Sequence, residues 1–564
     1  MEIMKTCFNK ILMVIGCTVM ISCNGIFDDL SVNPNQIDLN SFYTTPENVE
    51  KGILGAYGYI STPRNLGACG FGLQLSRSDE ASSGADYSMP GTYSDDYTSS
   101  YYSIVQPFQL MYTAAGQACQ MIQTIPNVEF VDEDLRNAYL GEAYFLRAFT
   151  HFFLFVNYRN IPLIKEMTGN ANEYRPQATP QESWEFIIGD LIEAERLLPV
   201  KGYWGESNLG RATKASAAAL LGKAYLYRSG IEKYYGNSTE TYYNEAAQAF
   251  GRVINGDYGT YDLVSDYSWN FDVAHENNDE SLWEIQLLGD VTNTNFNPGF
   301  VESGLFNDIR SKLPIMGQIT GYNASNAQVI HDWVYDIFVN SKNAAGETDP
   351  RMFGTLVFND NLPEIKAPSG CKVTFLEGDT WADEFGGVNA SFGDKWEAAK
   401  NYKCASRKWL DWTLPAENPG DDMYFFYGRA QGVNWRWIRY ADVLLMYAEA
   451  VVMGGRQTSI SALDAINQVR DRVNMPHVSE ANMKTIEQER ILELTYEGHR
   501  FYDLLRWGRL SERFRELEAS DPNFKAYNNG HTYKGFIEGK HEWVPIPIEE
   551  VEGNPYITSN NPGW

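Results

Sequence analysis

Residues 489–508 read ERILELTYEGHRFYDLLRWG, the most specific pattern in the 564-residue chain. Glu489, Glu493 and Glu497 are four residues apart, so a helix places them on one face. Three arginines of the same segment are expected to pair with these glutamates, across or between helices: Arg490, Arg500 and Arg506. The apolar residues form a stripe that should be buried: Ile491, Leu494, Phe501, Leu504 and Leu505. The pattern predicts an ion-paired structural helix over Asn482–Trp507, in preference to a catalytic one.

Other helices are indicated by apolar residues that recur at spacings of three and four. They are expected at Gln106–Ile125, Asp134–Phe155, Gln181–Leu198, Thr213–Arg228, Tyr243–Ile254, Tyr440–Met453 and Ile460–Arg472. A further helix is expected to start after Thr45, a candidate N-cap that Pro46 and Glu47 follow. The chain is therefore predicted to be mainly helical.

Two of these helices share a motif of tetratricopeptide repeats. Leu140–Tyr144 and Leu221–Tyr225 both fit the step L-G-x-x-Y, and Ala246 and Phe250 fit the A-x-x-x-F step after the second. Gly and Ala let paired helices approach closely, while Leu and Tyr fill the seam. The motifs predict an irregular array of helix pairs with loops inserted between them.

The pattern changes between Asn255 and Asn434, where Gly, Asn, Asp and Pro recur and helices are scarce. Residues 283–287 alternate like a short strand. A long region of this kind is usually functional.

We divide the chain into a signal peptide (1–22), a tether (23–44), a helical-repeat part (45–254) and a C-terminal region (255–564). The last comprises an irregular ligand-binding part (255–434) and closing helices with an extended tail (435–564).

The N-terminus has the features of an export signal. Lys5 and Lys10 precede an apolar run, Ile11–Met20, about half of the ~20 residues that a membrane-spanning helix needs. The run ends in Ser22 and Cys23, and this ending resembles the lipobox of bacterial lipoproteins, in which the cysteine becomes the lipidated first residue. An ordinary signal peptide with an incidental cysteine is the alternative. We expect lipidation of Cys23.

Charge and aromatic content narrow the class of ligand. The formal net charge is −28, from 45 basic and 73 acidic residues, which disfavours nucleic acid and anionic membranes as partners. Aromatic residues make up 14% of the chain, with 35 Tyr and 14 Trp, more than a core obviously requires. Their flat faces and polar edges suit ligand binding.

The sequence contains no motif for a catalytic, metal or cofactor site. HExxH, GxSxG, Walker A and D-x-D-x-D-G calcium-loop patterns are all absent, so no metal and no cofactor is predicted. The cysteines are widely spaced and form no C-x-x-C pair. A glycosidase would need two carboxylates at a defined separation, which a sequence does not specify.

The segment 489–508 resembles the C-terminal hallmark of the SusD/RagB family, the surface glycan- and nutrient-binding lipoproteins of Bacteroidetes. Similar stretches follow the family's order along the chain: residues 142–148, 161–164, 210–214, 221–227, 278–286, 349–351, 439–450, 545–547 and 561–564. The resemblance implies a mainly α, SusD-like fold, in which tetratricopeptide-like helix pairs support an irregular, loop-rich ligand-binding region.

The resemblance also implies partners. It suggests an outer-membrane lipoprotein, anchored through Cys23 and facing the cell exterior, that binds an oligosaccharide without catalysis. A SusC-like TonB-dependent transporter would lie beneath it and receive the glycan. Two alternatives remain open at this point: RagB-like relatives are associated with peptide uptake, and a glycoside hydrolase is a less favoured third class.

Candidate ligand residues follow from the shape of sugars, whose apolar C–H faces and hydroxyl rims pair with aromatic rings beside polar side chains. One cluster lies after Arg77 in a polar, Gly- and Ser-rich stretch: Asp79, Tyr87, Tyr93, Tyr97, Tyr101 and Tyr102. A second cluster comes from the irregular region: Trp269, Phe271, Phe296, Tyr322 and Trp333. For each of these residues, packing in the core is the alternative role.

Overall fold

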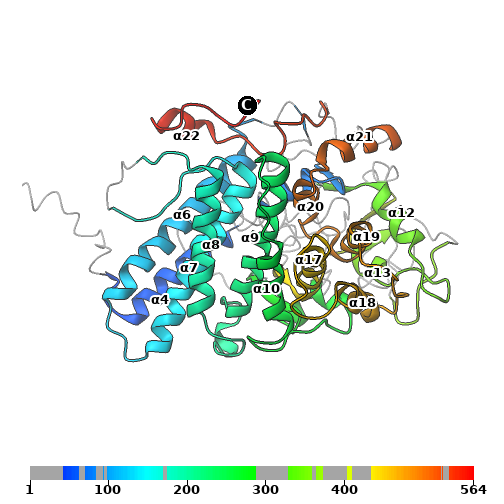
Figure 1. Ribbon diagram of the computed structural model, residues 1–564, viewed down its shortest axis with the longest axis horizontal. Coiled ribbons are helices and arrows are strands. Elements are labelled where there is room, and N and C mark those ends of the chain that lie inside the picture. Colours follow the sequence, from blue (N-terminus) through cyan, green and yellow to red (C-terminus); the bar gives the residue numbers. More distant parts are fainter. Residues whose placement is uncertain are drawn as a thin grey trace, which may run out of the picture.

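The computed structural model of the protein describes residues 42–62, 70–83, 93–94, 98–168, 174–286, 328–358, 364–371, 403–408, 433–521, 524 and 533–564. The expected signal peptide, Cys23 and most of the expected tether lie outside these residues. The described chain is mainly α-helical, as predicted. The long helices between residues 46 and 254 lie on one side and the helices between residues 332 and 520 on the other, while the helix at residues 548–553 lies over the first group (Figure 1).

A row of long helices forms the N-terminal half. It consists of α4 (Pro46–Ile60), α6 (Tyr102–Thr124), α7 (Glu133–Tyr158), α8 (Pro180–Leu197), α9 (Lys214–Tyr235) and α10 (Tyr243–Ile254). Each of these helices packs against the next one in the chain (Figure 1). The helices expected here from the sequence are all present, although α6 begins earlier and α9 ends later than predicted. Thr45 caps α4 as expected, because its side chain accepts a hydrogen bond from the Asn48 backbone.

Glycine lets the paired helices approach where the repeat motif places it. A Cβ atom on Gly222 of α9 would lie 2.6 Å from the ring of Phe250 on α10. A Cβ atom on Gly141 of α7 would lie 2.8 Å from the backbone nitrogen of Leu198, which follows α8. Real Cβ atoms do not come so close, so a larger residue would push the helices apart. The predicted tetratricopeptide-like pairing is therefore confirmed.

Short strands and smaller helices follow or interrupt these pairs. The helices are α5 (Phe71–Ser76), η2 (Ile125–Asn127), η3 (Glu206–Asn208), η4 (Tyr267–Phe271), η5 (Val273–His275), α12 (Asp332–Asn340), α13 (Arg351–Thr355), α17 (Tyr440–Val452), α18 (Ala462–Arg472), α19 (Met483–Leu494), α20 (Arg500–Arg506), α21 (Leu510–Ser520) and α22 (Ile548–Gly553). The strands pair antiparallel in twos: β1 (Ala81–Ser83) with β3 (Gln328–Ile330), β2 (Ser281–Ile285) with β6 (Trp435–Arg439), and β4 (Leu356–Phe358) with β5 (Cys404–Ser406). Strand β2 corresponds to the strand expected at residues 283–287.

The β2–β6 pair joins the two halves through aromatic contacts. Trp283 of β2 lies edge-on to Phe145 and Phe149 of α7, with ring centroids 4.9 and 4.7 Å apart. Trp437 of β6 also lies edge-on to Phe149, at 5.1 Å. Edge-to-face pairs of this kind stabilise a core beyond the area they bury. One continuous core therefore runs from the N-terminal helices into the C-terminal half.

The helix predicted over Asn482–Trp507 is in fact two helices, α19 and α20. The break falls at Thr495–His499, where Tyr496 and Gly498 adopt φ angles of 64° and 85°. Such left-handed backbone cannot continue an α-helix. The break moves Glu497 off the face of α19, so the even spacing of the glutamates does not describe one helical face.

A buried network of ion pairs surrounds the end of α19. Arg439, the last residue of β6, donates hydrogen bonds to Glu280 at 2.7 Å, to Glu493 at 2.5 Å and to Glu497 at 2.7 and 2.8 Å. All four side chains are inaccessible to solvent. Burial opposes ionisation of Glu493, but its arginine neighbours hold the pKa of this carboxyl well below its usual range.

The glutamates of the segment are thus ion-paired and structural, as predicted, but their expected partners were wrong. Glu489 and Glu493 accept from Arg351 at 2.6 and 3.0 Å, and Glu497 accepts from Lys408 at 2.8 Å. The three arginines of the segment pair with other acids: Arg490 with Asp442 and Asp503, Arg500 with Asp79 and Glu487, and Arg506 with Asp503 and Glu449. Apart from the local Arg506–Asp503 pair within α20, partners brought in by the tertiary fold satisfy these charges.

The C-terminal tail crosses the N-terminal helices. The side chain of Asn561 donates to the backbone oxygens of Tyr158 at 2.8 Å and Val544 at 2.7 Å. The backbone N–H of Val544 donates to Asn157 at 2.9 Å. Helix α22 lies beside the upper end of α6 in Figure 1. The last residues of the chain are therefore tied to α7, one of its first helices.

Replacing Arg439 tests the ion-pair network. Arg439→Met leaves three buried carboxylates short of their main partner, so we expect the free energy of unfolding to fall by about 3–5 kcal/mol. The matched control is Arg196→Met, which breaks an exposed pair with Glu193 and should change stability by less than about 0.5 kcal/mol. Chemical denaturation followed by tryptophan fluorescence measures both, and equal effects would contradict the prediction.

Replacing Gly222 tests the helix pairing. Gly222→Ala inserts a methyl group against Phe250, so we expect a loss of about 1–3 kcal/mol in unfolding free energy. Gly58→Ala, at an exposed position of α4 where a Cβ atom meets nothing within 4 Å, should instead be neutral or stabilise by up to about 1 kcal/mol. Thermal melting of the two variants beside the wild type decides the point, because propensity alone predicts stabilisation in both.

Candidate functional site

Asp79 is the predicted ligand residue that the structure defines best, and it is not on the surface. It lies between α5 and β1 and is completely buried. Its two carboxylate oxygens accept from Arg500 at 2.8 and 2.9 Å, and one also accepts from Arg513 at 2.6 Å. Burial alone would raise the pKa of Asp79, but the two guanidinium groups lower it to about 2. The expectation of a direct ligand contact by this carboxylate is therefore corrected: Asp79 is a structural ion-pair residue.

Asp79 nevertheless brings the two predicted clusters together. Strand β1, which follows it, pairs with β3, and Ala81 lies opposite Ile330. The backbone oxygen of Asp79 accepts from Trp333 Nε1 at 2.6 Å and lies 2.7 Å from His331 Nδ1. Trp333, from the second cluster, is thus fixed beside a residue of the first.

Trp333 is the most suitable aromatic platform among the predicted residues that the structure describes. Its ring is only partly buried, and the guanidinium of Arg513 lies 4.6 Å from the ring centroid. The hydrogen bond to Asp79 fixes the ring orientation, and an ordered ring costs less entropy when a ligand stacks on it. Trp333, Asp79 and Arg513 form what we call the Trp333 site.

The other predicted residues lie elsewhere. Trp269 is half-buried on η4 and stacks on His275, with centroids 4.3 Å apart and planes 6° from parallel. Phe271 is buried, with the Lys408 ammonium 4.3 Å from its ring. Tyr102 is the first residue of α6 and Tyr101 its N-cap, and both are half-buried.

Tyr93 belongs to the core rather than to a ligand surface. Its hydroxyl donates to the backbone oxygen of Arg77 at 2.8 Å, and its ring packs against Phe514, Phe536 and His541. The remaining candidates, Tyr87, Tyr97, Phe296 and Tyr322, lie outside the described residues, as does Cys23.

The pKa values of Glu80 and Asp79 differ in the way that those of the two catalytic carboxyl groups of a glycosidase do: one is raised and the other is low. Burial and the charge of Asp79 raise the pKa of Glu80 to about 8, whereas that of Asp79 is about 2. Both side chains, however, are sealed from solvent, with 2% and 0% of their surfaces exposed. A substrate cannot reach them, and the Glu80 carboxylate instead accepts from the Tyr496 backbone at 3.2 Å. The pair is therefore structural.

A second aromatic groove was not predicted from the sequence. This groove, of about 280 Å³, lies between the 201–211 loop and residues 277–284, with rings from Trp204 and Tyr261. Its one signal in the sequence was the glycine spacing around Trp204, since Gly202, Gly205 and Gly210 all adopt positive φ angles.

The polar groups of this groove are already engaged within the protein. Arg211 donates to Glu142 at 2.9 and 2.5 Å and to Glu50 at 2.7 Å. Its guanidinium lies 4.0 Å from the Trp204 ring, and Trp204 Nε1 donates to the backbone oxygen of Ala212 at 2.9 Å. The indole N–H of Trp333 and the guanidinium of Arg513 are engaged in the same way. The Trp333 site is preferred here because Trp333 belongs to a cluster predicted from the sequence and the groove does not.

The described residues contain neither a candidate metal site nor a helix that could span a membrane. Within the described ranges, His, Cys, Asp and Glu form no group of three or more that could hold a metal ion. No described helix is long and apolar enough to cross a membrane.

Comparison with known proteins identifies the family. Residues 279–564, half of the chain, match the family model described as SusD family, and residues 34–226 match one described as starch-binding associating with outer membrane. The chain belongs to the SusD family. This confirms the resemblance read from residues 489–508, and the second description links the family to the outer membrane.

The relatives of this SusD-family chain extend over its whole length. SusD-like protein P2 of Formosa agariphila is 27% identical over 98% of this chain and 99% of its own. A SusD superfamily protein from Bacteroides vulgatus has the same fold, with a TM-score of 0.68, 24% identity and coverage of 93% and 100% of the two chains. A laminarin-binding SusD-like protein covers 92% of this chain and 100% of its own, with a TM-score of 0.62 and 22% identity.

The pH dependence of stability tests the placement of Glu80. The pKa of Glu80 is about 8 in the folded protein, against an ordinary 4.5. Its contribution to the free energy of unfolding is therefore complete below pH 4.5 and is lost as the pH rises through 8. Glu80→Gln keeps the shape of the neutral acid. We expect this variant to melt close to the wild type at pH 5 and higher, by roughly 2 °C or more, at pH 9.

A matched control separates this effect from general alkaline destabilisation. Glu185→Gln removes an exposed carboxylate of α8 and should follow the wild type at both pH values. If Glu80→Gln also follows the wild type at pH 9, burial does not raise the pKa of Glu80, and the prediction is wrong.

Proposed function

We propose that this SusD-family protein binds neutral oligosaccharides at the cell surface without catalysis and delivers them to a SusC-like TonB-dependent transporter. The observation that carries the proposal is the family match, which extends over the C-terminal half and includes a starch-binding description for the N-terminal half. The laminarin-binding protein of the same fold supports a glycan ligand. In this proposal residues 1–22 are a signal peptide, Cys23 carries the lipid, and residues 23–44 tether the protein to the outer membrane.

The chemistry of the described residues supports a neutral ligand. The formal net charge of −28 repels polyanions. Trp333 offers an aromatic face, and Arg513 beside it offers guanidinium N–H groups to sugar hydroxyls. We place the main glycan contact at the Trp333 site, in the irregular region expected from the sequence to hold the ligand.

A non-catalytic role agrees with the state of the nearby acids. Asp79 is held ionised by Arg500 and Arg513, so it cannot supply a proton at neutral pH. Glu80 can hold a proton, but it is buried. Glycosidase chemistry needs both an accessible acid and an accessible base.

Affinity gel electrophoresis in laminarin, starch and other neutral polysaccharides tests the proposal. We expect at least one polysaccharide to retard the protein, and Trp333→Ala to weaken this binding about tenfold or more, because a stacked ring is lost. Trp564→Ala is the matched control: its indole is also partly buried, donates to backbone oxygens and lies 4.0 Å from a cation, Lys540. Melting temperatures of both variants show whether they are folded.

Three outcomes would contradict the proposal. Release of reducing sugar during incubation with the bound polysaccharide would show a hydrolase. Binding of a peptide panel in calorimetry, with no polysaccharide retained, would show a RagB-type peptide binder. Equal loss of binding in Trp333→Ala and Trp564→Ala would remove the Trp333 site from the proposal.

A further inference from the structure

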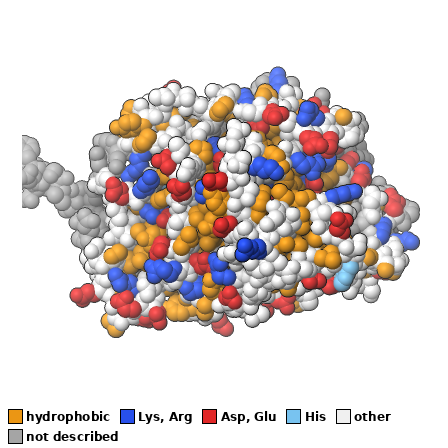
Figure 2. Space-filling view, viewed as in Figure 1, with side chains coloured by type: hydrophobic (Ala, Val, Ile, Leu, Met, Phe, Trp, Pro, Cys, Tyr) orange, Lys and Arg blue, Asp and Glu red, His pale blue; other side chains and the backbone are white. Residues whose placement is uncertain are grey.

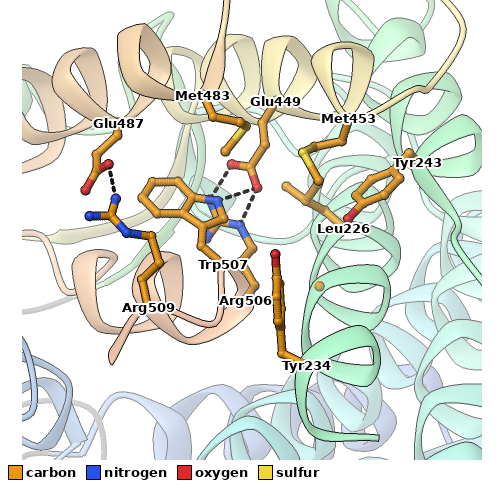
Figure 3. A pocket seen from close by; sticks show the side chains of 11 residues that line it. Leu226, Tyr234, Tyr243, Glu449, Met453, Met483, Glu487, Arg506, Trp507 and Arg509 are labelled. Atoms are coloured by element: carbon orange, nitrogen blue, oxygen red, sulfur yellow. Dashed lines mark hydrogen bonds and ion pairs between the residues drawn. The ribbon is translucent and has the colours of Figure 1, made fainter. Parts of the chain in front are cut away.

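A pocket of about 180 Å³, distinct from the Trp333 site, opens where helices α9 and α10 meet α17, α19 and α20. Figure 3 shows Leu226, Tyr234 and Tyr243 on one wall, with Met453, Met483 and Trp507 facing them. Figure 2 shows apolar side chains gathered in the middle of this face of the molecule. Arg506 and Trp507, at the end of the segment 489–508, form part of the pocket lining.

Two glycines form the pocket by bringing α9 against the end of α20. A Cβ atom on Gly230 would lie 2.3 Å from the backbone oxygen of Arg506. Gly508, with a φ angle of 67°, would place a Cβ atom 2.5 Å from the ring of Tyr234. The close approach leaves the rings of Tyr234 and Trp507 on the same cavity (Figure 3).

The charges that line the pocket cancel in pairs. Glu449 accepts from Arg506 at 2.7 and 2.5 Å and from Trp507 Nε1 at 2.9 Å. Glu487 pairs with Arg509 and with Arg500. The lining therefore carries no uncompensated charge that would select an ion, and a neutral ligand fits it best.

Two tyrosine hydroxyls supply polar groups that the protein does not use. Within the described part of the chain, neither Tyr234 nor Tyr243 has a hydrogen-bond partner for its hydroxyl. Tyr243 is only 7% exposed, yet its hydroxyl is directed into the pocket in Figure 3. Burial, with a smaller effect of Glu449, raises its pKa to about 12, so the hydroxyl remains a donor at neutral pH. Because the described residues leave both hydroxyls unused, both are available to a polar ligand that enters the pocket.

We propose that this pocket binds one neutral pyranose ring, as a second subsite for the glycan of the proposed function, on which the inference rests. Its volume is below the roughly 300–1,000 Å³ of sites for larger ligands, so it admits a single ring. The Trp507 ring faces the C–H surface of the sugar, and Tyr234 and Tyr243 bond its hydroxyl rim. An apolar side chain of a protein partner would leave both hydroxyls unsatisfied.

Saturation-transfer NMR of the full chain with methyl β-D-glucopyranoside, methyl β-D-galactopyranoside and methyl α-D-mannopyranoside tests the proposal. We expect transfer to at least one glycoside. Tyr234→Ala should weaken it about tenfold through loss of a ring, and Tyr243→Phe about threefold or more through loss of one hydroxyl. Tyr556→Ala, which removes an exposed tyrosine of the C-terminal tail, should leave it unchanged.

The outcomes separate this subsite from the proposed function. Polysaccharide retention without transfer to any glycoside overturns the subsite and leaves the proposed function in place. Transfer that Tyr234→Ala and Tyr243→Phe do not reduce, while both variants melt like the wild type, also overturns it. Failure of polysaccharides and glycosides alike overturns both.

Discussion

Arg439 and the carboxylates around it are the interaction on which the rest of the molecule depends. One guanidinium binds Glu280 before β2, Glu493 at the end of α19 and Glu497 in the break before α20. Each of these charges would be very unfavourable alone in the interior, and only their mutual pairing makes burial tolerable. The network therefore specifies one relative placement of β2, β6 and α19, because any other would leave charges unpaired. It contributes specificity more than net stability.

The same principle extends to the candidate site. Arg500, directly after the break, binds Asp79, and the backbone of Asp79 in turn holds Trp333. The charges of residues 489–508 have structural roles. Through Asp79, one of them also fixes the ring of Trp333, which remains partly open to solvent. The structural polar groups are buried, and the ring that we propose to contact a sugar lies at their edge. This arrangement explains why Asp79 matters to the site although no ligand can reach its carboxylate.

Much of the fold could be predicted from the sequence, because helix periodicity, caps and the glycine steps of the repeat are local signals. The N-cap role of Thr45, the close helix approach at Gly222 and the structural role of residues 489–508 could all be predicted without knowledge of the tertiary fold. The ion-pair partners and the break at Tyr496 were not, since most partners come from other elements of the fold: Asp442 lies 48 residues from Arg490, and Arg351 lies 138 residues from Glu489. The candidate site was predicted least well. Tyr93 and Trp333 are both aromatics in polar stretches, and only packing distinguishes a core ring from a surface one.

The crossing of the C-terminal tail over α7 has a consequence for the order in which the chain can fold. Asn561 completes the hydrogen bonds of Tyr158, and Arg500 and Arg513 neutralise Asp79, so early helices wait for the last residues to be synthesised. Contacts over more than four hundred residues make folding slow, because loop closure precedes the gain from the contact. The contacts of the tail with α7 therefore form only after residues 544–561 have been synthesised.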